Sequence, residues 1–181
     1  MGVSMKAIQY IEKGRPEVVE LPIPEPGEGQ VLVKISGVAT CPQWDMHVMD
    51  GVPIAPGGKL EYPYTPGQPG HEATGKVSEI GPGVAEFAAG DRVAFWQDQA
   101  GAKQGCYAEY VTAEVGNLLK VPSFLEPQEI ASLELAMCVQ VSFDQIQNVA
   151  RIQGKRFAVS GLGPAGLVAI QLAKAHGASE V

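Results

Sequence analysis

One turn near the end of the chain limits the possible folds more than any other feature. Three glycines share the spacing Gly-x-Gly-x-x-Gly: Gly161, Gly163 and Gly166. A short β-prone run at 156–160 precedes them, and an apolar run with helical spacing at 164–176 follows. A strand, a glycine turn and a helix in this order are typical of the first unit of a dinucleotide-binding sheet. The sequence therefore predicts a strand at 156–160 and a helix at 164–176, with Gly177 as its left-handed cap.

Each glycine of the turn meets a different physical demand. Gly161 allows a tight turn, Gly163 lets the backbone approach a pyrophosphate, and Gly166 lets the helix pack closely on the strand. The predicted cofactor-binding residues are Gly161, Gly163, Pro164, Ala165 and Gly166. The alternative is a plain strand-to-helix turn that is rich in glycine. The acidic residue that selects NAD or NADP is expected about 20 residues further on, at or beyond Val181, so both cofactors stay open.

The first two thirds of the chain have a different texture. Short β-prone runs are separated by proline and glycine, at 6–11, 30–38, 73–80, 92–95 and 106–112. Many short strands with such turns favour a barrel or sandwich. The segment 126–149 has apolar residues at helical spacing and predicts one or two helices. We therefore expect a barrel-type domain at 1–150 and the start of a nucleotide-binding domain at 151–181.

Charge and cysteine content exclude several classes of function. The net charge of −7 is spread without acidic blocks, and no lysine or arginine stripe could neutralise a phosphate backbone, so nucleic acid is not an expected partner. The apolar runs are too short to span a bilayer and the N-terminus lacks a signal peptide, so we expect a cytoplasmic protein without a membrane partner. The three cysteines are an odd number, which favours reduced thiols or metal ligands over disulfides.

Two further stretches carry chemistry-bearing side chains in a fixed order. The first, 37–47, contains Cys41 and His47, and the second, 66–72, ends on Gly-His71-Glu72. A Gly-x-Gly-Val turn at 81–84 and the motif Gly-Asp-Arg-Val at 90–93 follow. Together with the glycine turn, these motifs resemble the medium-chain dehydrogenase/reductase superfamily, and more narrowly its zinc-containing alcohol and polyol dehydrogenases. The resemblance runs from residue 5 to residue 181.

The resemblance implies a fold and an activity. The fold is α+β followed by α/β: a co-chaperonin-like, partly open β-barrel catalytic domain and then the first β-turn-α unit of a truncated Rossmann fold. The activity is zinc-dependent hydride transfer between an alcohol or polyol and NAD or NADP, with this chain as an N-terminal fragment. A small-molecule alcohol or carbonyl compound would be the substrate, and the complete protein would be a homo-oligomer.

The resemblance also implies a metal site. Cys41 and His71 correspond to two ligands of the catalytic zinc, and a thiolate and an imidazole suit that ion. The third ligand is Glu134 by the polyol-type pattern, in which a glutamate precedes a Cys-Val pair by four residues. Cys138 lies one helical turn from Glu134 on the same face and is the alternative. The other reading of both residues is structural, with a packed cysteine and a solvated glutamate.

Two departures from the family change the expected details. Three residues separate Cys41 from the following aspartate, where relatives have two, and the serine or threonine that relays the substrate proton is missing. We therefore expect proton release to use His47 or water, with Glu72 as a neighbour of the ligands or an occasional ligand. The segment 95–106 has one cysteine, Cys106, where many relatives have four, so one catalytic zinc and no structural zinc is expected.

Two alternatives remain open. The first is a zinc-free quinone or enoyl-type reductase of the same superfamily, in which Cys41 and His71 would be vestigial. The second is an inactive, truncated binding module. Measurement of bound metal separates the zinc enzyme from the zinc-free reductase.

Overall fold

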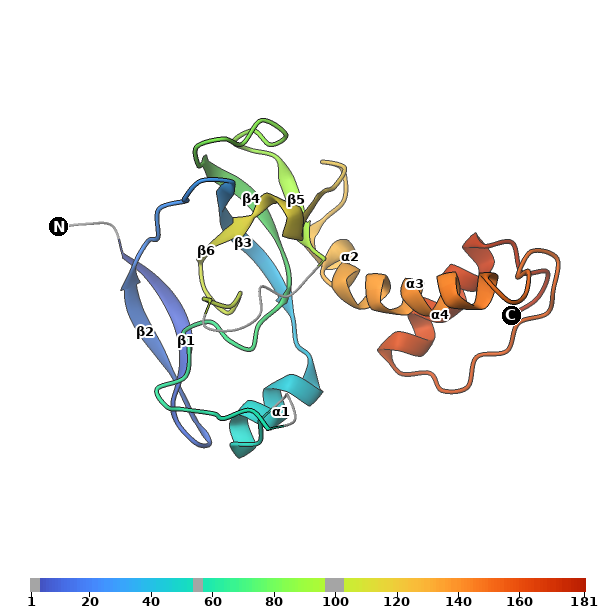
Figure 1. Cartoon of the computed structure of the whole chain (residues 1–181), viewed down its shortest axis with the longest axis horizontal. Coiled ribbons are helices and arrows are strands. Elements are labelled where there is room, and N and C mark those ends of the chain that lie inside the picture. Colours follow the sequence, from blue (N-terminus) through green and yellow to red (C-terminus); the bar gives the residue numbers. More distant parts are fainter. Residues whose placement is uncertain (1–3, 54–56, 97–102) are drawn as a thin grey trace. The chain divides into compact units, whose positions relative to one another are not determined.

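A computed structural model describes residues 4–53, 57–96 and 103–181 of the chain (Figure 1). Contacts between residues divide the chain into two compact units, Met1–Ser132 and Leu133–Val181. The two units are described separately. The predicted domain boundary after residue 150 stays a prediction.

The first unit is built mainly from antiparallel strands. Its described strands are β1 (Ser4–Glu12), β2 (Arg15–Pro22), β3 (Gln30–Ala39), β4 (Glu72–Ile80), β5 (Arg92–Phe95), β6 (Tyr110–Glu114) and β7 (Leu118–Lys120). Its helices are α1 (Pro42–Asp50), the 3₁₀ turn η1 (Val115–Asn117) and α2 (Pro127–Ile130). Strands β1 and β2 form a hairpin, and the larger sheet has the order β6-β3-β4-β5-β7.

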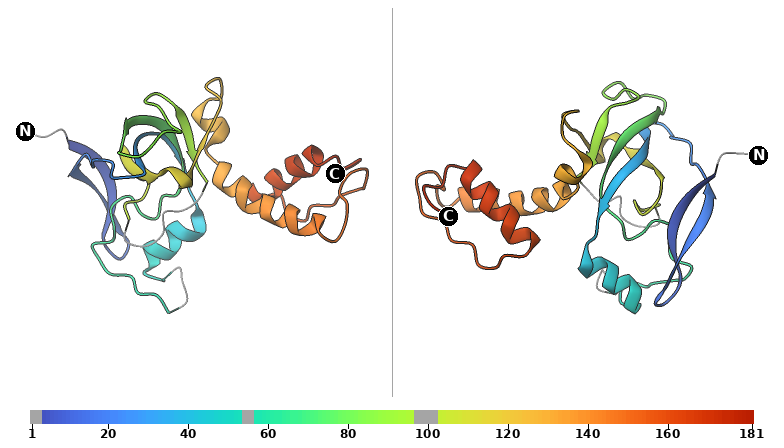
Figure 2. Two further views of the ribbon diagram at one scale, coloured as in Figure 1. Left: turned by 45° about the horizontal axis from the view of Figure 1, so that its top comes forward. Right: turned by 180° about the vertical axis from the view of Figure 1, so that it is seen from behind.

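The segment that leads into β6 joins the hairpin to the larger sheet. Ala7 of β1 and Ala108 form an antiparallel bridge. The Ile8 amide donates to the Tyr107 carbonyl at 2.8 Å, and the Glu109 amide donates to the Lys6 carbonyl at 3.0 Å. These bonds connect the two sheets into one partly open β structure, which Figure 2 shows from two further sides. The predicted partly open barrel is confirmed.

Hydrophobic patterning explains which strands form the core. In β1, Met5 and Ala7 are buried while their neighbours are exposed, as expected for a strand with one covered face. In β3, Val31, Leu32 and Val33 are all buried, because this strand lies between β4 and β6. The core of the unit consists of Val31, Val33, Ala73, Val77, Val93, Phe95, Cys106, Val111, Ala113 and Leu118.

Strands β2 and β7, helix α1 and the 3₁₀ turn η1 were not predicted from the sequence, and one strand is shorter than predicted. The run at 106–112 forms a strand only from Tyr110 onward. Before Tyr110, the backbone amides of Cys106 and Tyr107 form hydrogen bonds to a loop instead of a neighbouring strand. Cys106 donates to the Gly70 carbonyl, and Tyr107 donates to the Gly67 carbonyl. This segment is therefore a connection to a loop rather than a regular strand.

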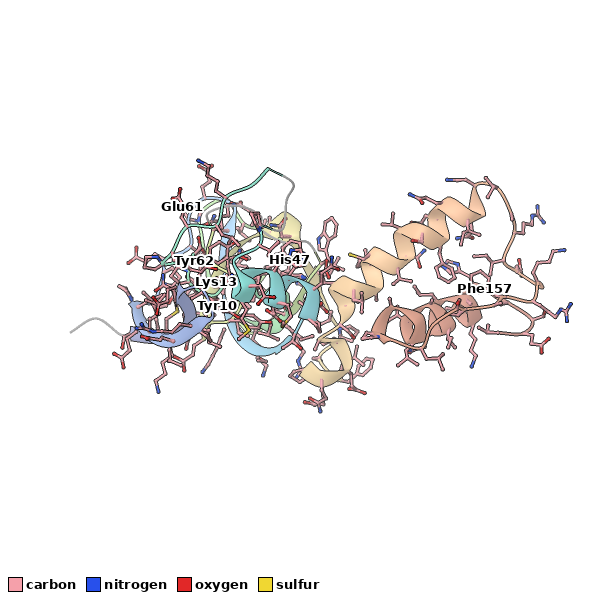
Figure 3. All side chains as sticks on the ribbon, turned by 90° about the horizontal axis from the view of Figure 1, so that it is seen from below. Tyr10, Lys13, His47, Glu61, Tyr62 and Phe157 are labelled. Carbon is pink, nitrogen blue, oxygen red and sulfur yellow. The ribbon has the colours of Figure 1, made fainter. Side chains whose placement is uncertain are left out.

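The second unit contains two helices and a glycine turn. Helices α3 (Leu133–Gln147) and α4 (Pro164–Ala175) enclose a small core of Phe143, Ile152 and Ala173. Phe157, labelled in Figure 3, stacks on Phe143 with ring centroids 5.3 Å apart. The prediction of one or two helices at 126–149 is confirmed by α2 and α3.

The glycine turn is flanked by less strand than predicted. The run 156–160 makes one parallel bridge, from Arg156 to Glu180, and the Phe157 amide donates to the Glu180 carbonyl at 2.9 Å. The predicted strand is therefore wrong as a regular strand, because a ladder needs several paired residues and the neighbouring segment 178–181 supplies a single bridge. The helix at 164–176 is confirmed, and Gly177 has φ +80° as its cap requires.

In the part of the chain that the structure describes, no helix combines the length and apolar character needed to cross a membrane.

Candidate metal centre

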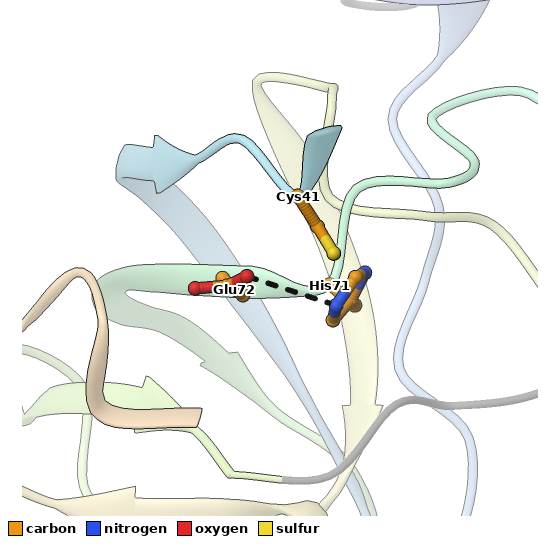
Figure 4. Close-up of side chains that lie close together, drawn as sticks. All are labelled: Cys41, His71 and Glu72. Atoms are coloured by element: carbon orange, nitrogen blue, oxygen red, sulfur yellow. Dashed lines mark ion pairs between the residues drawn. The ribbon is translucent and has the colours of Figure 1, made fainter. Parts of the chain in front are cut away.

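Three side chains of the first unit converge on one point (Figure 4). The Cys41 sulfur, an imidazole nitrogen of His71 and a carboxylate oxygen of Glu72 all lie within 4.8 Å of one another. Cys41 follows β3 and is the N-cap residue of α1, while His71 and Glu72 lead into β4. Since β3 and β4 pair with Ala39 opposite Glu72, the end of one strand meets the start of the other. The strand register therefore assembles the cluster.

The tautomer of His71 follows from its hydrogen bond. The ring is buried, with 7% of its surface exposed, and its Nδ1 lies 2.7 Å from the Pro69 carbonyl oxygen. A carbonyl only accepts, so Nδ1 carries the proton and donates. In the neutral ring Nε2 then carries the lone pair, and this atom lies 3.9 Å from Glu72 Oε1. A histidine that donates through one nitrogen to a backbone carbonyl is oriented as metal-binding histidines are.

The donor set fits a divalent metal ion. A thiolate, an imidazole nitrogen and a carboxylate oxygen are the donors that zinc takes in proteins, and catalytic zinc sites use three protein ligands. Glu72 is 6% exposed and Cys41 is partly exposed, so the cluster combines a buried carboxylate with a thiol open to solvent.

The loop that carries His71 is fixed by backbone contacts to a second loop. The Cys106 amide donates to the Gly70 carbonyl at 2.7 Å, and the Tyr107 amide donates to the Gly67 carbonyl at 3.0 Å. A Cβ on Gly67 would lie 2.1 Å from the Gly105 carbonyl oxygen, and Gly67 has φ +77°. Gly67 and Gly105 must both be glycine, because the two loop backbones cross in direct contact at these residues. Sequence reasoning missed this crossing.

Helix α1 brings further side chains to the cluster. The ring of Trp44 lies 4.7 Å from that of His71, centroid to centroid. The Asp45 carboxylate accepts the Tyr107 hydroxyl, with O···O distances of 3.0 and 2.9 Å. Burial, followed by the hydrogen bond to Asp45, raises the pKa of Tyr107 well above its usual range. Tyr107 therefore stays protonated as a donor. Sequence reasoning singled out none of these contacts.

His47, the predicted proton acceptor, also lies on α1 and is labelled in Figure 3. Its Nδ1 atom is buried and has no hydrogen-bond partner among the described residues. The role of His47 in proton transfer stays a prediction.

The two candidates for the third ligand belong to the second unit. Glu134 and Cys138 lie one turn apart on α3, and the Cys138 thiol donates to Glu134 Oε1 at 3.2 Å. Within the first unit, the carboxylate of the cluster is that of Glu72. The assignment of Glu134 or Cys138 as a ligand stays a prediction.

The glycine turn of the second unit has the backbone that its spacing predicts. Gly161 has φ +99°, and a Cβ on Gly166 would lie 2.0 Å from the Gly161 carbonyl oxygen. A Cβ on Gly163 would meet no described atom within 4 Å, so the space beside it is open. Gly161 thus suits a tight turn, Gly166 suits close packing of α4, and Gly163 leaves room for another molecule to approach the backbone. Nucleotide binding by Gly161, Gly163, Pro164, Ala165 and Gly166 stays a prediction.

Part of the segment that is expected to lack a structural zinc, residues 97–102, lies outside the described residues. The expectation that no second zinc binds stays a prediction.

Comparison with known proteins gives consistent matches. The family model of the alcohol dehydrogenase GroES-like domain matches residues 27–123 of this chain. An alcohol dehydrogenase of Rhizobium meliloti (strain 1021) is 30% identical over 97% of this chain and 56% of its own length. An L-threonine 3-dehydrogenase of Pyrococcus horikoshii is 31% identical over 100% of this chain and 56% of its own length.

Solved structures agree with these matches. A candidate zinc-binding dehydrogenase from Sinorhizobium meliloti 1021, solved with NADP bound, superposes with a TM-score of 0.79 at 26% identity. The superposition covers 98% of this chain and 55% of that one. The chain thus spans about half the length of the relatives that it matches.

Proposed function

This chain belongs to the alcohol dehydrogenase family of the medium-chain dehydrogenase/reductase superfamily, and from this we propose that it serves zinc-dependent hydride transfer. The substrate is a small alcohol or polyol, or the corresponding carbonyl compound, and the hydride partner is NAD or NADP. The observation that carries the proposal is the cluster of Cys41, His71 and Glu72, with His71 oriented by the Pro69 carbonyl.

Each residue of the cluster can supply one ligand atom to zinc. Cys41 Sγ and His71 Nε2 would bind the ion, and a carboxylate would complete the set. That carboxylate is Glu72 within the described cluster or Glu134, as the sequence predicts. When bound, zinc supplies a Lewis acid that makes the alcohol proton easier to remove near neutral pH.

The chain's own side chains handle the proton and the orientation of the substrate. The position that holds a relay hydroxyl in relatives is altered here, because three residues, 42–44, stand where relatives have two. We infer that His47 or water accepts the proton, and the His47 Nδ1 has no hydrogen-bond partner among the residues that the structure covers. Trp44 packs against His71 and would restrict which substrates reach the ligands. Gly161, Gly163 and Gly166 would receive the cofactor pyrophosphate.

Metal analysis tests the proposal. The purified chain, prepared with zinc present, should hold about one zinc per chain, as a single catalytic site requires. Cys41→Ser and His71→Ala should each remove it. Cys138→Ser removes an exposed thiol of the second unit and should keep the zinc unless Cys138 is the third ligand. Zinc-free wild-type protein would contradict the zinc enzyme and favour the zinc-free reductase.

The same measurement identifies the third ligand. Glu72→Gln and Glu134→Gln each remove one carboxylate without changing the side-chain size. If Glu72 is the ligand, only the first variant should bind zinc more weakly. Loss of zinc from Cys138→Ser would instead support the cysteine alternative, and a second bound zinc would contradict the prediction of a single site.

A further inference from the structure

We propose that Tyr107 is a positioning residue of the metal centre, which fixes where Cys41 stands relative to His71. The proposal rests on the proposed metal site. Tyr107 is distant in sequence from both ligands, yet it is bonded to the segments that carry each of them. It thereby connects two ligands that come from different loops.

The backbone of Tyr107 is attached to the loop that carries His71. Its amide donates to the Gly67 carbonyl at 3.0 Å, and the preceding amide, of Cys106, donates to the Gly70 carbonyl at 2.7 Å. The aromatic ring packs directly under this loop: a Cβ on Gly70 would lie 2.8 Å from the Tyr107 ring carbon Cγ. The tyrosine backbone and ring therefore cannot shift independently of the residue next to His71.

The hydroxyl of Tyr107 is attached to the helix that carries Cys41. It donates to the Asp45 carboxylate at 2.9 to 3.0 Å. The Asp45 amide in turn donates to the Cys41 carbonyl at 2.9 Å, which is the first hydrogen bond of α1. Hydrogen bonds to ionised groups are stronger than neutral ones, and partial burial protects this one from water. The connection runs from Tyr107 through Asp45 to the backbone of Cys41.

The N-cap of α1 depends on this link because it has no cap of its own. Cys41 makes no side-chain capping hydrogen bond, and Pro42 follows it in the helix. Without the Tyr107 hydroxyl, the first turn of α1 would lose the hydrogen bond at Asp45 that connects it to the His71 loop. Residues that hold metal ligands in place typically change metal affinity 10- to 100-fold when they are mutated, so an effect of about that size is expected.

Cobalt(II), added alone to the metal-free full chain, is the probe. Its charge-transfer absorption reports bonds to cysteine thiolate, which loss of the band in Cys41→Ser assigns to Cys41, and titration against a chelator gives its affinity. Tyr107→Phe keeps the ring and removes the hydroxyl, so we expect cobalt binding about 10-fold to 100-fold weaker and a changed thiolate band. Asp45→Ala should have the same effect. The double variant should bind no more weakly than the weaker single variant, because both remove one link.

Tyr62→Phe is the matched control. The Tyr62 hydroxyl donates to the Val48 carbonyl at 2.6 Å and so holds the other end of the same helix. Its loss should leave the cobalt spectrum and affinity close to those of the wild type. Equal affinities of Tyr107→Phe and Tyr62→Phe would overturn the proposal.

The Asp45→Ala variant and the cobalt spectrum of the wild type distinguish failure of the Tyr107 proposal from failure of the metal site. If Tyr107→Phe does not fold, as judged by circular dichroism, Asp45→Ala decides alone, because it leaves the Tyr107 ring in place. Wild-type affinity in that variant would overturn the positioning role. If the wild type itself binds cobalt without a thiolate band, the proposed metal site fails, whereas normal wild-type binding with unaffected variants refutes the role of Tyr107 only.

Discussion

The crossing of two loops beside the metal centre predicts that Gly105→Ala will be strongly destabilising. Gly105 does not have a left-handed backbone, so alanine is disfavoured there by space alone. A Cβ at this position would lie 2.3 Å from the Gly67 carbonyl oxygen and 2.5 Å from the Gln68 nitrogen. These are backbone atoms, which cannot turn aside as the end of a side chain can. Relief requires the two loops to separate.

The size of the effect follows from what that separation breaks. Heavy atoms prefer to be about 3.5 Å apart or more, so the loops must part by about 1 Å. Three backbone hydrogen bonds cross the contact, donated by Gly105, Cys106 and Tyr107 at 3.0, 2.7 and 3.0 Å. Each contributes about 1 kcal/mol, and overpacking of this kind costs about 1 to 3 kcal/mol. We expect the free energy of unfolding to fall by about 3 kcal/mol. This is a large share of the about 5 to 15 kcal/mol that is typical of a domain.

Urea unfolding followed by tryptophan fluorescence measures this loss. The chain has two tryptophans, Trp44 and Trp96, and both lie in the first unit. The matched control is Gly116→Ala, because a Cβ there meets no described atom within 4 Å and should change stability by less than about 0.5 kcal/mol. Equal midpoints for the Gly105 and Gly116 variants would refute the reasoning. A normal midpoint with unchanged zinc content would show that the loops tolerate the added methyl group.

Three further predictions concern the other parts of the chain. Gly163→Val should weaken NADP binding, measured by calorimetry, while leaving stability and zinc content unchanged, because open space surrounds this position; unchanged affinity would contradict the nucleotide site. Gly166→Ala should loosen the second unit, seen as faster amide exchange in α4, since its Cβ would lie 2.0 Å from the Gly161 carbonyl oxygen; wild-type exchange rates would refute this. The hydrogen bond from Lys120 lowers the pKa of Asp91, so this carboxylate stabilises the fold above its unfolded-state pKa and ceases to do so as pH falls through its folded-state pKa. Asp91→Asn should therefore be less stable than the wild type near neutral pH, and the difference in urea midpoint should disappear in acid; a constant difference would exclude the ion pair as its cause.

Local patterns in the sequence predicted those elements whose cause is local. Strand β3 and helix α4 were predicted because a run of valines and a helical period are visible within a few residues. Strand β2 was missed because its side chains are mostly exposed and two prolines, Pro16 and Pro22, lie within it. As one half of a hairpin, it depends on pairing with β1 rather than on its own burial.

The site shows the same division between local and distant causes. The motif around His71 identified Cys41, His71 and Glu72 from the resemblance, and the structure brings these three together. The Tyr107–Asp45 bond joins residues 62 positions apart, and nothing in either segment indicates that they meet. Contacts of this kind follow from the strand register and the loop crossing, which a single sequence does not reveal.

These contacts imply that the fold itself, rather than an ion, arranges the side chains of the proposed metal centre. His71 is oriented by the Pro69 carbonyl, and its loop is bound to the segment at 105–107, which itself pairs with β1. Cys41 is placed by the end of β3 and the start of α1. The buried apolar cluster that stabilises the unit includes neither ligand, so its hydrophobic contribution to folding does not depend on metal. A catalytic ion must also leave a position open for substrate, and ligands held in place by the fold can do this without the ion completing its own shell. The proposed site would therefore resemble a catalytic centre, in contrast to zinc fingers, where the metal drives folding.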